Sequence, residues 1–323
     1  MTDLAYPADL QAICPGCVKT NFSLKQIARW NIGGIADCFV EPENPGQVGR
    51  IVKYCNDQGL PWLAVGYGSN LLFDDAGFKG VIIQLAGKLS ACLIDGRRVR
   101  AQAGIWVPKL AWMLGKRGLT GIEHAIGIPG TLGGLVIMNG GSLQKGIGMN
   151  IEYVTVLDSE GNQKILNKSD CGFSYRYSVL QDAKNIVLEA ELSLARRDKA
   201  QVRKEMLSIL RSRRNKFPLK LPNCGSVFLN NPKIHEKVGP PGKIIEEAGL
   251  KGVKIGGAQV STLHANFIVN LGTASSNDVL RLVSLIRARV FENTNYSMDC
   301  EIHYVSPAGS VKPLHEALSQ FKG

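Results

Sequence analysis

The densest concentration of glycine, from Gly127 to Gly141, is the feature that most restricts how this chain can fold. Six glycines fall within these fifteen residues, which read GIPGTLGG and, after three apolar residues, MNGG. Glycine weakens helix and strand interiors by roughly 0.5–1 kcal/mol, so this density indicates a backbone that turns sharply or closely approaches another group. A tight bend at a sheet edge and contact with a flat or anionic ligand explain the segment equally well.

A second glycine loop, Gly66-Tyr67-Gly68-Ser69-Asn70, directly follows a predicted strand, Trp62–Val65. Glycines permit positive φ, and successive exposed backbone N–H groups form a concave nest that suits a phosphate. The loop is not the Rossmann fingerprint, because Leu71 stands in place of the third glycine and no acidic residue follows at the usual distance. A plain turn would also explain this loop alone, but two such loops in one half of the chain favour a dinucleotide ligand.

The 323 residues predict roughly two domains, and a hydrophobic content of 45% predicts an ordinary buried core. No apolar run approaches the ~20 residues of a membrane helix, and the start, MTDLAYPADL, does not resemble a secretory signal. We therefore expect a cytoplasmic protein without membrane insertion. The eight cysteines lack regular metal-ligand spacing, so we expect free thiols and no metal. Cys14 and Cys17 form a C-x-x-C, which we interpret as part of an N-terminal tail.

The net charge of +11 is concentrated between Arg196 and Lys220, where ten Lys or Arg and two Asp or Glu give a local charge of +8. Within this run Val202, Met206 and Ile209 recur at helical spacing, which predicts an amphipathic helix from about 200 to 216 with a solvated basic face. A non-enzymatic nucleic-acid binder is an alternative. The run lacks the interleaved aromatic residues of a single-strand binder, so we expect no nucleic-acid partner. A positive field that attracts anionic small molecules fits equally well.

Apolar periodicity and turn residues predict an α+β fold in two parts. The second part contains a helix that begins with a capping box at Ser275 and Asp278. In the first part, strands are expected at Trp62–Val65, Gly80–Gln84, Arg98–Ala103, Ile151–Leu157 and Ile186–Ala195, and helices at Pro45–Cys55 and Val107–Lys116. In the second, a short helix is expected at Ile244–Ala248 and strands at Ala265–Asn270 and Ser297–Val305.

Four further segments carry groups suited to chemistry. In FSYRYS, from Phe173 to Ser178, an arginine between aromatic residues can present a rigid fork to a carboxylate. Taken singly, each of the four segments is more typical of a turn, a strand or an edge carboxylate. His264 alone is more typical of a hydrogen-bonded structural histidine. The other three are GSVFLNNP from Gly225 to Pro232, GGAQVS from Gly256 continuing to HANF at Phe267, and DCEI from Asp299 to Ile302.

Together and in this order, the segments resemble the UDP-N-acetylenolpyruvoylglucosamine reductases, the MurB family of bacterial cell-wall synthesis. The resemblance runs from about Leu24 to Val305, and its strongest matches are GYGSNLL, IPGTLGG, SYRYS, CGSVF and HANFIVN. It implies a PCMH-type FAD-binding region at 20–200, with two α+β lobes at about 20–88 and 89–200, and an α+β C-terminal substrate domain at 201–323. It also implies NADPH-dependent reduction, through FAD, of UDP-N-acetylglucosamine enolpyruvate to UDP-N-acetylmuramate in peptidoglycan precursor synthesis.

The resemblance further implies roles for particular residues. Ser226 falls at the family's proton-donor position, and Arg176 and Glu301 fall at its other two catalytic positions. Three residues fall at or near substrate-binding positions: Tyr175, Asn230 and His264. The cofactor-binding positions correspond to Gly66, Tyr67, Gly68, Ser69, Asn70, Gly127, Ile128, Pro129, Gly130, Thr131, Gly133 and Gly134.

The spacing within the resemblance is also informative. Only fifty positions separate Arg176 from Ser226, which resembles the shorter type II form of the family, so no tyrosine clamp is expected. The chain departs from the family pattern at Tyr67, at Asn139-Gly140-Gly141 and at Leu229-Asn230-Asn231-Pro232, where a common lysine is absent. Because of the last departure, the residues that contact the substrate diphosphate are not assigned. The alternative enzyme is another PCMH-type FAD oxidoreductase acting on a hydroxy acid or sugar, against which CGSVF and HANFIVN weigh.

Overall fold

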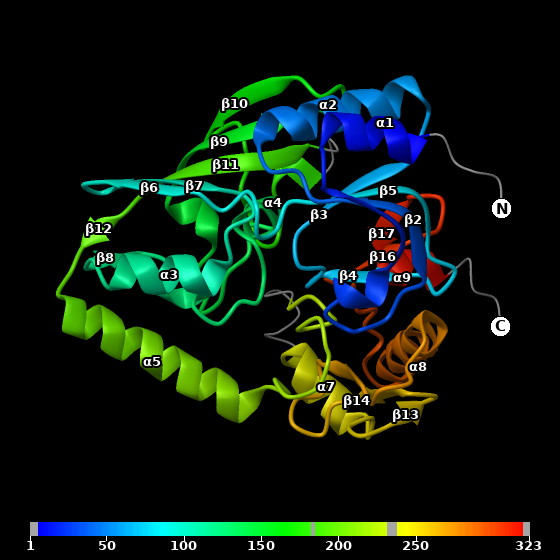
Figure 1. Ribbon diagram of the computed structural model, residues 1–323. Helices are drawn as coiled ribbons and strands as arrows, with labels where there is room; N and C mark the ends of the chain where they lie inside the picture. Colours follow the sequence, from blue (N-terminus) through cyan, green and yellow to red (C-terminus); the bar gives the residue numbers. More distant parts are fainter. Residues whose placement is uncertain (1–5, 182–184, 231–237, 319–323) are drawn as a thin grey trace. The chain divides into compact units, whose positions relative to one another are not determined.

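The computed structural model describes residues 6–181, 185–230 and 238–318 (Figure 1). The chain forms two units that alternate along the sequence. The first unit comprises residues 1–20, 38–67 and 80–213, and the second comprises 21–37, 68–79 and 214–323. This grouping differs from the linear boundary expected near residue 200, because two N-terminal segments pack with the C-terminal part. Trp30 illustrates the reason: its ring is fully buried in the second unit, and its indole N–H donates to the Ile268 carbonyl at 2.7 Å.

Two sheets account for most strands of the first unit. One has the order β1-β2-β5-β3, with β3 and β5 parallel, and the other is antiparallel with the order β10-β9-β11-β7-β6. The strands expected at Trp62–Val65 and Ile151–Leu157 are confirmed as β3 and β9. The others are β1 Val18–Ser23, β2 Ile35–Val40, β5 Phe78–Gln84, β6 Cys92–Asp95, β7 Arg98–Gln102, β10 Gln163–Asn167 and β11 Ile186–Ser193, with β8 Leu119–Thr120 and β12 Ala195–Arg196 forming a separate pair.

Helices of the first unit begin where local chemistry favours them. The Asn44 side chain accepts a hydrogen bond from the Gln47 N–H at 3.0 Å, and Pro45 occupies the first turn, so α2 begins there. α1 lies beside α2 (Figure 1), and α4 packs on β11. The helices are α1 Tyr6–Ile13, α2 Pro45–Asp57, α3 Val107–Gly115, α4 Leu132–Ile137 and α5 Lys199–Lys216, with 3-10 turns at Glu123–Ala125, Ile147–Met149 and Val179–Gln181.

The interpretation of Cys14 and Cys17 as part of a tail is wrong. Both side chains are buried beside Leu10 in a hydrophobic cluster of the first unit, next to the residues of α2. The sequence reading failed because α1 is short, and its apolar stripe is too brief to distinguish a docked helix from a tail. Burial raises the pKa of the Cys14 thiol to about 12, so this group stays protonated at neutral pH.

The basic segment forms the amphipathic helix that its periodicity predicts. Val202, Met206 and Ile209 are buried in the largest cluster of the first unit, and most of the Lys and Arg side chains of this helix are exposed. Met206 packs against Gly115 at the end of α3, where a Cβ would overlap its methyl group. The positive charge of this segment is therefore carried on the solvent side of a helix whose other side is core.

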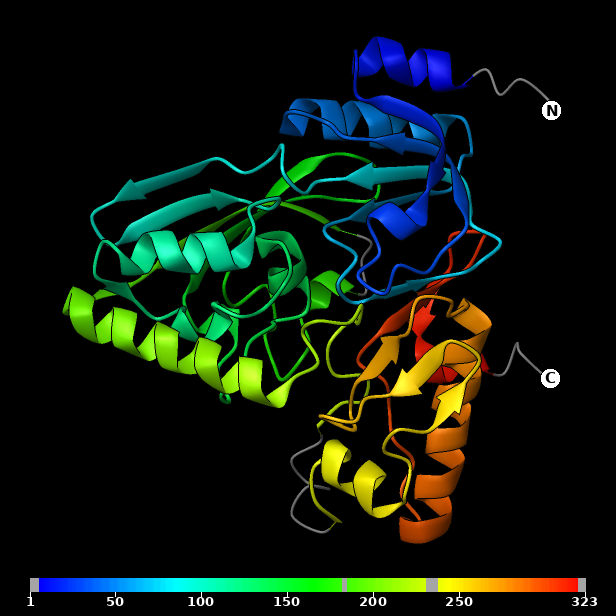
Figure 2. The same ribbon diagram turned by 60° about the horizontal axis from the view of Figure 1, so that its bottom comes forward.

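The second unit has two three-stranded sheets and the long helix α8, which lies along one of them (Figure 2). The capping box predicted at Ser275 and Asp278 is confirmed, with the two residues bonded reciprocally at 3.0 Å. The sheets have the orders β13-β14-β15 and β17-β16-β4. The elements are β4 Leu71–Phe73, α7 Pro241–Glu247, β13 Lys254–Ile255, β14 Ala258–Val260, β15 Ile268–Asn270, α8 Ser276–Thr294, β16 His303–Val305, β17 Val311–Pro313 and α9 Leu314–Ala317, with a 3-10 turn at Leu24–Gln26.

The strand expected at Ser297–Val305 is wrong over most of its length. Only His303–Val305 forms a strand, and Cys300 makes an isolated bridge to Phe228. The Met298 carbonyl instead accepts a hydrogen bond from the Arg287 side chain at 2.7 Å, which directs this backbone toward α8 rather than into a ladder. Within the described ranges, none of the helices is long and apolar enough to cross a membrane.

One buried side chain in the first unit is poorly satisfied. His124 is 2% exposed, and neither of its ring nitrogens has a hydrogen-bond partner among the residues that the structure describes. Burial, reinforced by the positive charge of Lys145, lowers its pKa to about 4. Because its unfolded-state pKa is near 6.5, the unfolded chain binds the proton first as the pH falls, and this costs stability between about pH 6.5 and 4.

We expect His124→Phe to stabilise the protein at pH 7, because unpaired buried polar atoms each cost about 1–3 kcal/mol. We also expect the variant to lose less stability on acidification, by about 3 kcal/mol at pH 4. Urea unfolding of wild type and variant at pH 7 and about pH 4 measures both effects. Identical pH dependence in the two proteins would show that His124 is satisfied in solution.

Candidate active site

The two glycine-rich loops meet within the first unit. A Cβ on Gly66 would overlap the Thr131 side chain, and a Cβ on Gly133 would lie 2.9 Å from the Ala103 Cβ. Thr131 caps α4 and accepts a hydrogen bond from the Gly134 N–H at 3.4 Å. The end of β3 and the start of α4 are thus in contact, and glycine at 66 is required for this approach.

Backbone N–H groups in both loops have no protein acceptor. Among the described residues, none accepts a hydrogen bond from the N–H groups of Gly66, Tyr67, Gly127 or Thr131. The same holds, in the second unit, for the N–H groups of 68, 69 and 70. Gly68 has φ +53°, and a Cβ there would lie 2.5 Å from the Ile27 carbonyl oxygen, so only glycine fits. A run of uncovered N–H groups fits an anionic group such as a phosphate.

Arg176 lies at the tip of a two-residue turn in the first unit. Ser174 and Tyr177 pair through both backbone hydrogen bonds, at 3.0 and 3.2 Å. Arg176 has φ +55°, the left-handed region that turns of this kind normally reserve for glycine or asparagine. The ring centre of Tyr175 lies 5.6 Å from the guanidinium carbon. An arginine in this conformation costs about 1–2 kcal/mol, so the surrounding structure must hold it there.

Arg213 is a candidate that the sequence reading missed. Its side chain packs over Gly127, where a Cβ would overlap it, and burial together with the charge of Arg176 lowers its pKa. Arg213 follows Met206 by seven residues and Ile209 by four, so helical periodicity places it on the buried stripe of α5. That spacing was the available signal. Two guanidinium groups close enough to affect each other form a positive region beside the Gly127–Gly134 loop.

The backbone segments that carry Ser226 and Glu301 pair with each other in the second unit. The Glu301 N–H donates to the Val227 carbonyl at 2.8 Å, and the Leu229 N–H donates to the Asp299 carbonyl at 2.9 Å. The segment that carries Ser226 is held from its other side by Asn266. The Asn266 side-chain amide exchanges two hydrogen bonds with the Phe228 backbone, at 2.9 and 3.0 Å, and is buried.

The Asn70 side chain serves the protein itself. Its amide donates to the Glu301 carbonyl at 3.0 Å, and it lies 3.5 Å from a ring nitrogen of His303. The His303 N–H donates in turn to the Asn70 carbonyl at 3.1 Å. The side chain of Asn70 therefore positions the backbone of Glu301. The backbone N–H of Asn70 is the group that remains available to a ligand.

The proposed substrate-binding residues lie in different surroundings. His264 meets Phe217 and Phe267 edge-on, with ring centres 5.4 and 5.2 Å away, and the two phenylalanine rings stack on each other at 4.9 Å. The His264 Nδ1 accepts a hydrogen bond from the Asn266 N–H at 3.3 Å. Burial lowers its pKa, so the neutral ring presents Nε2 as a donor. Tyr175 and Asn230 are exposed. Asn231 and Pro232 lie outside the described residues.

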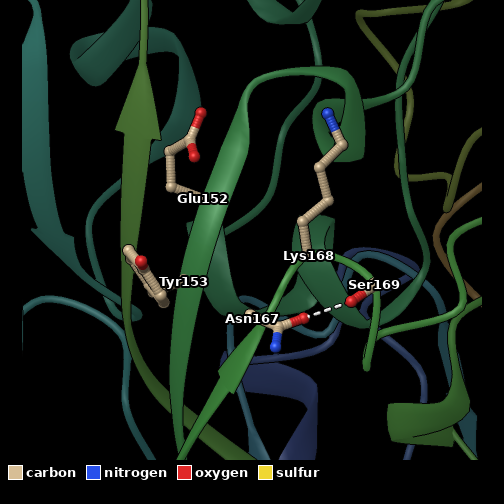
Figure 3. Close-up of a pocket in the computed structure, with 5 residues that line it drawn as sticks. All are labelled: Glu152, Tyr153, Asn167, Lys168 and Ser169. Carbon is tan, nitrogen blue, oxygen red and sulfur yellow. Dashed lines mark hydrogen bonds between the residues drawn. The ribbon is translucent and has the colours of Figure 1, made fainter.

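A shallow hollow on the first unit contains none of the predicted site residues (Figure 3). It lies at β9 and β10, where the Ser169 hydroxyl donates to the Asn167 side chain at 2.5 Å and the Lys168 ammonium donates to the Met149 carbonyl at 2.8 Å. Its lining residues are Glu152, Tyr153, Asn167, Lys168 and Ser169. Asn167, Lys168 and Ser169 are thus engaged with one another or with the backbone, and the hollow holds none of the groups assigned to chemistry.

Two protein-family models match the chain. Residues 36–167 match an FAD binding domain, and residues 217–305 match the C-terminal domain of UDP-N-acetylenolpyruvoylglucosamine reductase. UDP-N-acetylenolpyruvoylglucosamine reductase 1 of Corynebacterium glutamicum is 46% identical over 301 residues, which cover 93% of this chain and 90% of that protein. The chain belongs to the UDP-N-acetylenolpyruvoylglucosamine reductase family.

Other members of this reductase family agree with that assignment. The enzyme of Heliobacterium modesticaldum is 40% identical over 280 residues, covering 87% of this chain and 88% of its own. The crystal structure of the MurB reductase from Thermus caldophilus superposes with a TM-score of 0.74 at 32% identity, covering 88% of this chain and 97% of the other. The expected fold class, α+β with an FAD-binding region and a C-terminal domain, is confirmed.

We expect Asn266→Ala to destabilise this family member by about 2–4 kcal/mol, because it removes two hydrogen bonds and leaves buried backbone groups of Phe228 unpaired. Asn277, exposed near the start of α8, provides the matched control, and Asn277→Ala should stay within ±0.5 kcal/mol. Urea unfolding measures both. Equal stability of the two variants would contradict the anchoring role of Asn266.

Proposed function

We propose that this chain is an FAD-dependent reductase that uses NADPH to convert UDP-N-acetylglucosamine enolpyruvate to UDP-N-acetylmuramate, a step of peptidoglycan precursor synthesis. The observation that carries the proposal is the pair of glycine loops, whose backbone N–H groups lack acceptors among the described residues and whose contact at Gly66 and Thr131 permits only glycine. The reaction would take place in the cytoplasm, where NADPH and UDP-sugars are available.

The loops fit a dinucleotide. The N–H groups of Gly66, Tyr67, Gly127 and Thr131, all in the first unit, would hold its phosphates. The residues of the first loop are Gly66, Tyr67, Gly68, Ser69 and Asn70, and those of the second are Gly127, Ile128, Pro129, Gly130, Thr131, Gly133 and Gly134. Bound FAD would supply the capacity to store a hydride between oxidation of NADPH and reduction of the sugar nucleotide.

Arg176 and Glu301 would stabilise the charge that develops during the reaction. Addition of hydride to the terminal carbon of the enolpyruvyl double bond moves an electron pair onto the adjoining carboxylate, which becomes an enolate. A guanidinium offers two parallel N–H donors to such a carboxylate. We assign this contact to Arg176. We assign to Glu301 the role of orienting the substrate carboxylate as it becomes an enolate. Preorganised electrostatics of this kind usually supply the largest catalytic effect.

Ser226 would complete the reaction by donating its hydroxyl proton to the carbon next to the carboxylate. A serine is a weak acid, so it needs a neighbouring cation that stabilises its alkoxide or a relay that replaces the lost proton. His264, with Nε2 as its donor, would bind an oxygen of the substrate, together with Tyr175 and Asn230. Arg213 extends the positive region around Arg176, which suits a substrate that carries a carboxylate and a diphosphate.

We expect Gly66→Ala to weaken FAD binding by roughly 5- to 150-fold, because the methyl group displaces Thr131, and such overpacking costs about 1–3 kcal/mol. The control is Gly49→Ala in α2, where the new Cβ meets only ordinary contact at 3.4 Å. Flavin content after gel filtration and fluorescence titration with FAD compare the two. FAD retained equally by both variants would refute the assignment of this loop.

We expect Ser226→Ala to leave flavin reduction by NADPH intact and to slow reoxidation by UDP-N-acetylglucosamine enolpyruvate by about 10²–10⁴-fold. Stopped-flow absorbance resolves the two half-reactions. Ser284→Ala, an exposed serine of α8 in the same unit, should change neither. A variant at Ser226 that loses both half-reactions to the same extent would argue against this serine as the proton donor.

A further inference from the structure

The C-terminus of α4 ends in a defined left-handed cap. The Gly140 N–H donates to the Leu135 carbonyl at 2.7 Å, and the Asn139 N–H donates to the Val136 carbonyl at 3.0 Å. Asn139 has φ +39°. This pair of bonds with a left-handed residue is the Schellman motif, and asparagine is the non-glycine residue best suited to it. The cap bonds use the carbonyls of Leu135 and Val136, and the Ile137 carbonyl takes no part in them.

The Ile137 carbonyl is taken up by the segment that follows Arg176. The Ser178 hydroxyl donates to it at 2.6 Å, and the Gln181 side-chain amide donates to it at 3.0 Å. The same amide nitrogen of Gln181 donates to the Arg176 carbonyl, also at 3.0 Å. Ser178 is fully buried. Gln181 therefore joins the last turn of α4 directly to the backbone of Arg176.

Asn139 adds a connection on the other side of the turn. Its side-chain amide donates to the Ser174 carbonyl at 2.6 Å, and its side-chain oxygen accepts from the Gly148 N–H at 2.9 Å. The turn that carries Arg176 is thus held at Ser174, before the arginine, and at the arginine's own carbonyl. Left-handed residues other than glycine persist where the surroundings over-determine them, and these hydrogen bonds provide that constraint.

We propose that Asn139, Ser178 and Gln181 are positioning residues, which hold Arg176 in its strained left-handed conformation and fix it to α4. The opposite end of this six-residue helix begins at Thr131, in the Gly127–Gly134 loop. α4 therefore acts as a rigid spacer, so that the loop assigned to the cofactor and the arginine assigned to the substrate carboxylate keep one spacing. This inference rests on the proposed function of Arg176.

The test replaces Gln181 with Met, which is similar in size and removes the hydrogen bond to the Arg176 carbonyl. We expect FAD content and flavin reduction by NADPH to remain unchanged, and reoxidation by UDP-N-acetylglucosamine enolpyruvate to slow by roughly 10- to 100-fold, as expected for a catalytic group displaced by about 1 Å. The control is Gln102→Met in β7, which also removes a side-chain hydrogen bond to the backbone, one that the Gln102 side-chain oxygen accepts from the Ala91 N–H at 2.9 Å.

A double-mutant cycle separates positioning from simple loss of stability. If Gln181 acts through Arg176, Gln181→Met should slow reoxidation no further in an Arg176→Ala background. An effect that persists in that background, an equal loss of both half-reactions, or normal reoxidation by Gln181→Met alone would overturn the proposal. If Arg176→Ala itself reoxidises at the wild-type rate, the proposed function of Arg176 fails, and that outcome is distinct from the other three.

Asn139→Asp provides a second variant if Gln181→Met does not accumulate as folded protein. The aspartate retains the acceptor for the Gly148 N–H and loses the donor to Ser174. It should show the same selective slowing of reoxidation. If both half-reactions of this variant proceed at wild-type rates, the result would count against the network. The flavin spectrum of each variant reports whether the cofactor environment has changed.

Discussion

The approach of the Gly66 backbone to the Thr131 side chain is the contact on which the first unit depends. β3 ends there and α4 begins there, so the contact fixes the end of a strand against the start of a helix. Any side chain at Gly66 would separate them. Since no described residue accepts a hydrogen bond from several N–H groups of these loops, the contact that shapes the fold also leaves a surface suited to an anion. Glycine at position 66 therefore serves both the packing of β3 against α4 and the exposure of these N–H groups.

The two units hold their candidate catalytic groups in different ways. In the second unit, Ser226 and Glu301 are set by ordinary backbone pairing, reinforced by the buried amide of Asn266. In the first, Arg176 is held in a conformation that its own side chain disfavours. Strain at a single residue persists only where several bonds oppose its release, and Gln181 and Asn139 supply such bonds. The backbone that carries the Arg176 side chain is thereby fixed by the fold itself.

Much of the architecture followed from local patterns. β3, β9 and the capping box at Ser275 were predictable because each depends on residues within one short segment. The division into units was not, because Trp30 and Ile268 are far apart in sequence, and periodicity carries no information on long-range partners. Cys14 and Cys17 were misread for the same reason. Only coordinates show which core a short amphipathic helix joins.

The residue types of the candidate site were predictable from the sequence. The residues that hold them in place by hydrogen bonds were less so. Repeated glycines and an arginine between tyrosines indicated binding and chemistry, and the resemblance to a family gave the roles. The supports are harder to read, because Asn70, Asn139 and Gln181 act through single amide hydrogen bonds, which leave no periodic trace. Arg213 is an intermediate case, since its place on the buried stripe of α5 was present in the spacing and was hidden by the abundance of surrounding charge.

The most direct test of the account is a single turnover without oxygen. The purified protein is reduced with one equivalent of NADPH, mixed with UDP-N-acetylglucosamine enolpyruvate, and followed by flavin absorbance and mass spectrometry of the nucleotide. We predict that the oxidised flavin spectrum returns and that one UDP-N-acetylmuramate forms for each flavin. A flavin that stays reduced until oxygen is admitted, with the nucleotide unchanged, would contradict the assignment of this chain as a reductase of that substrate.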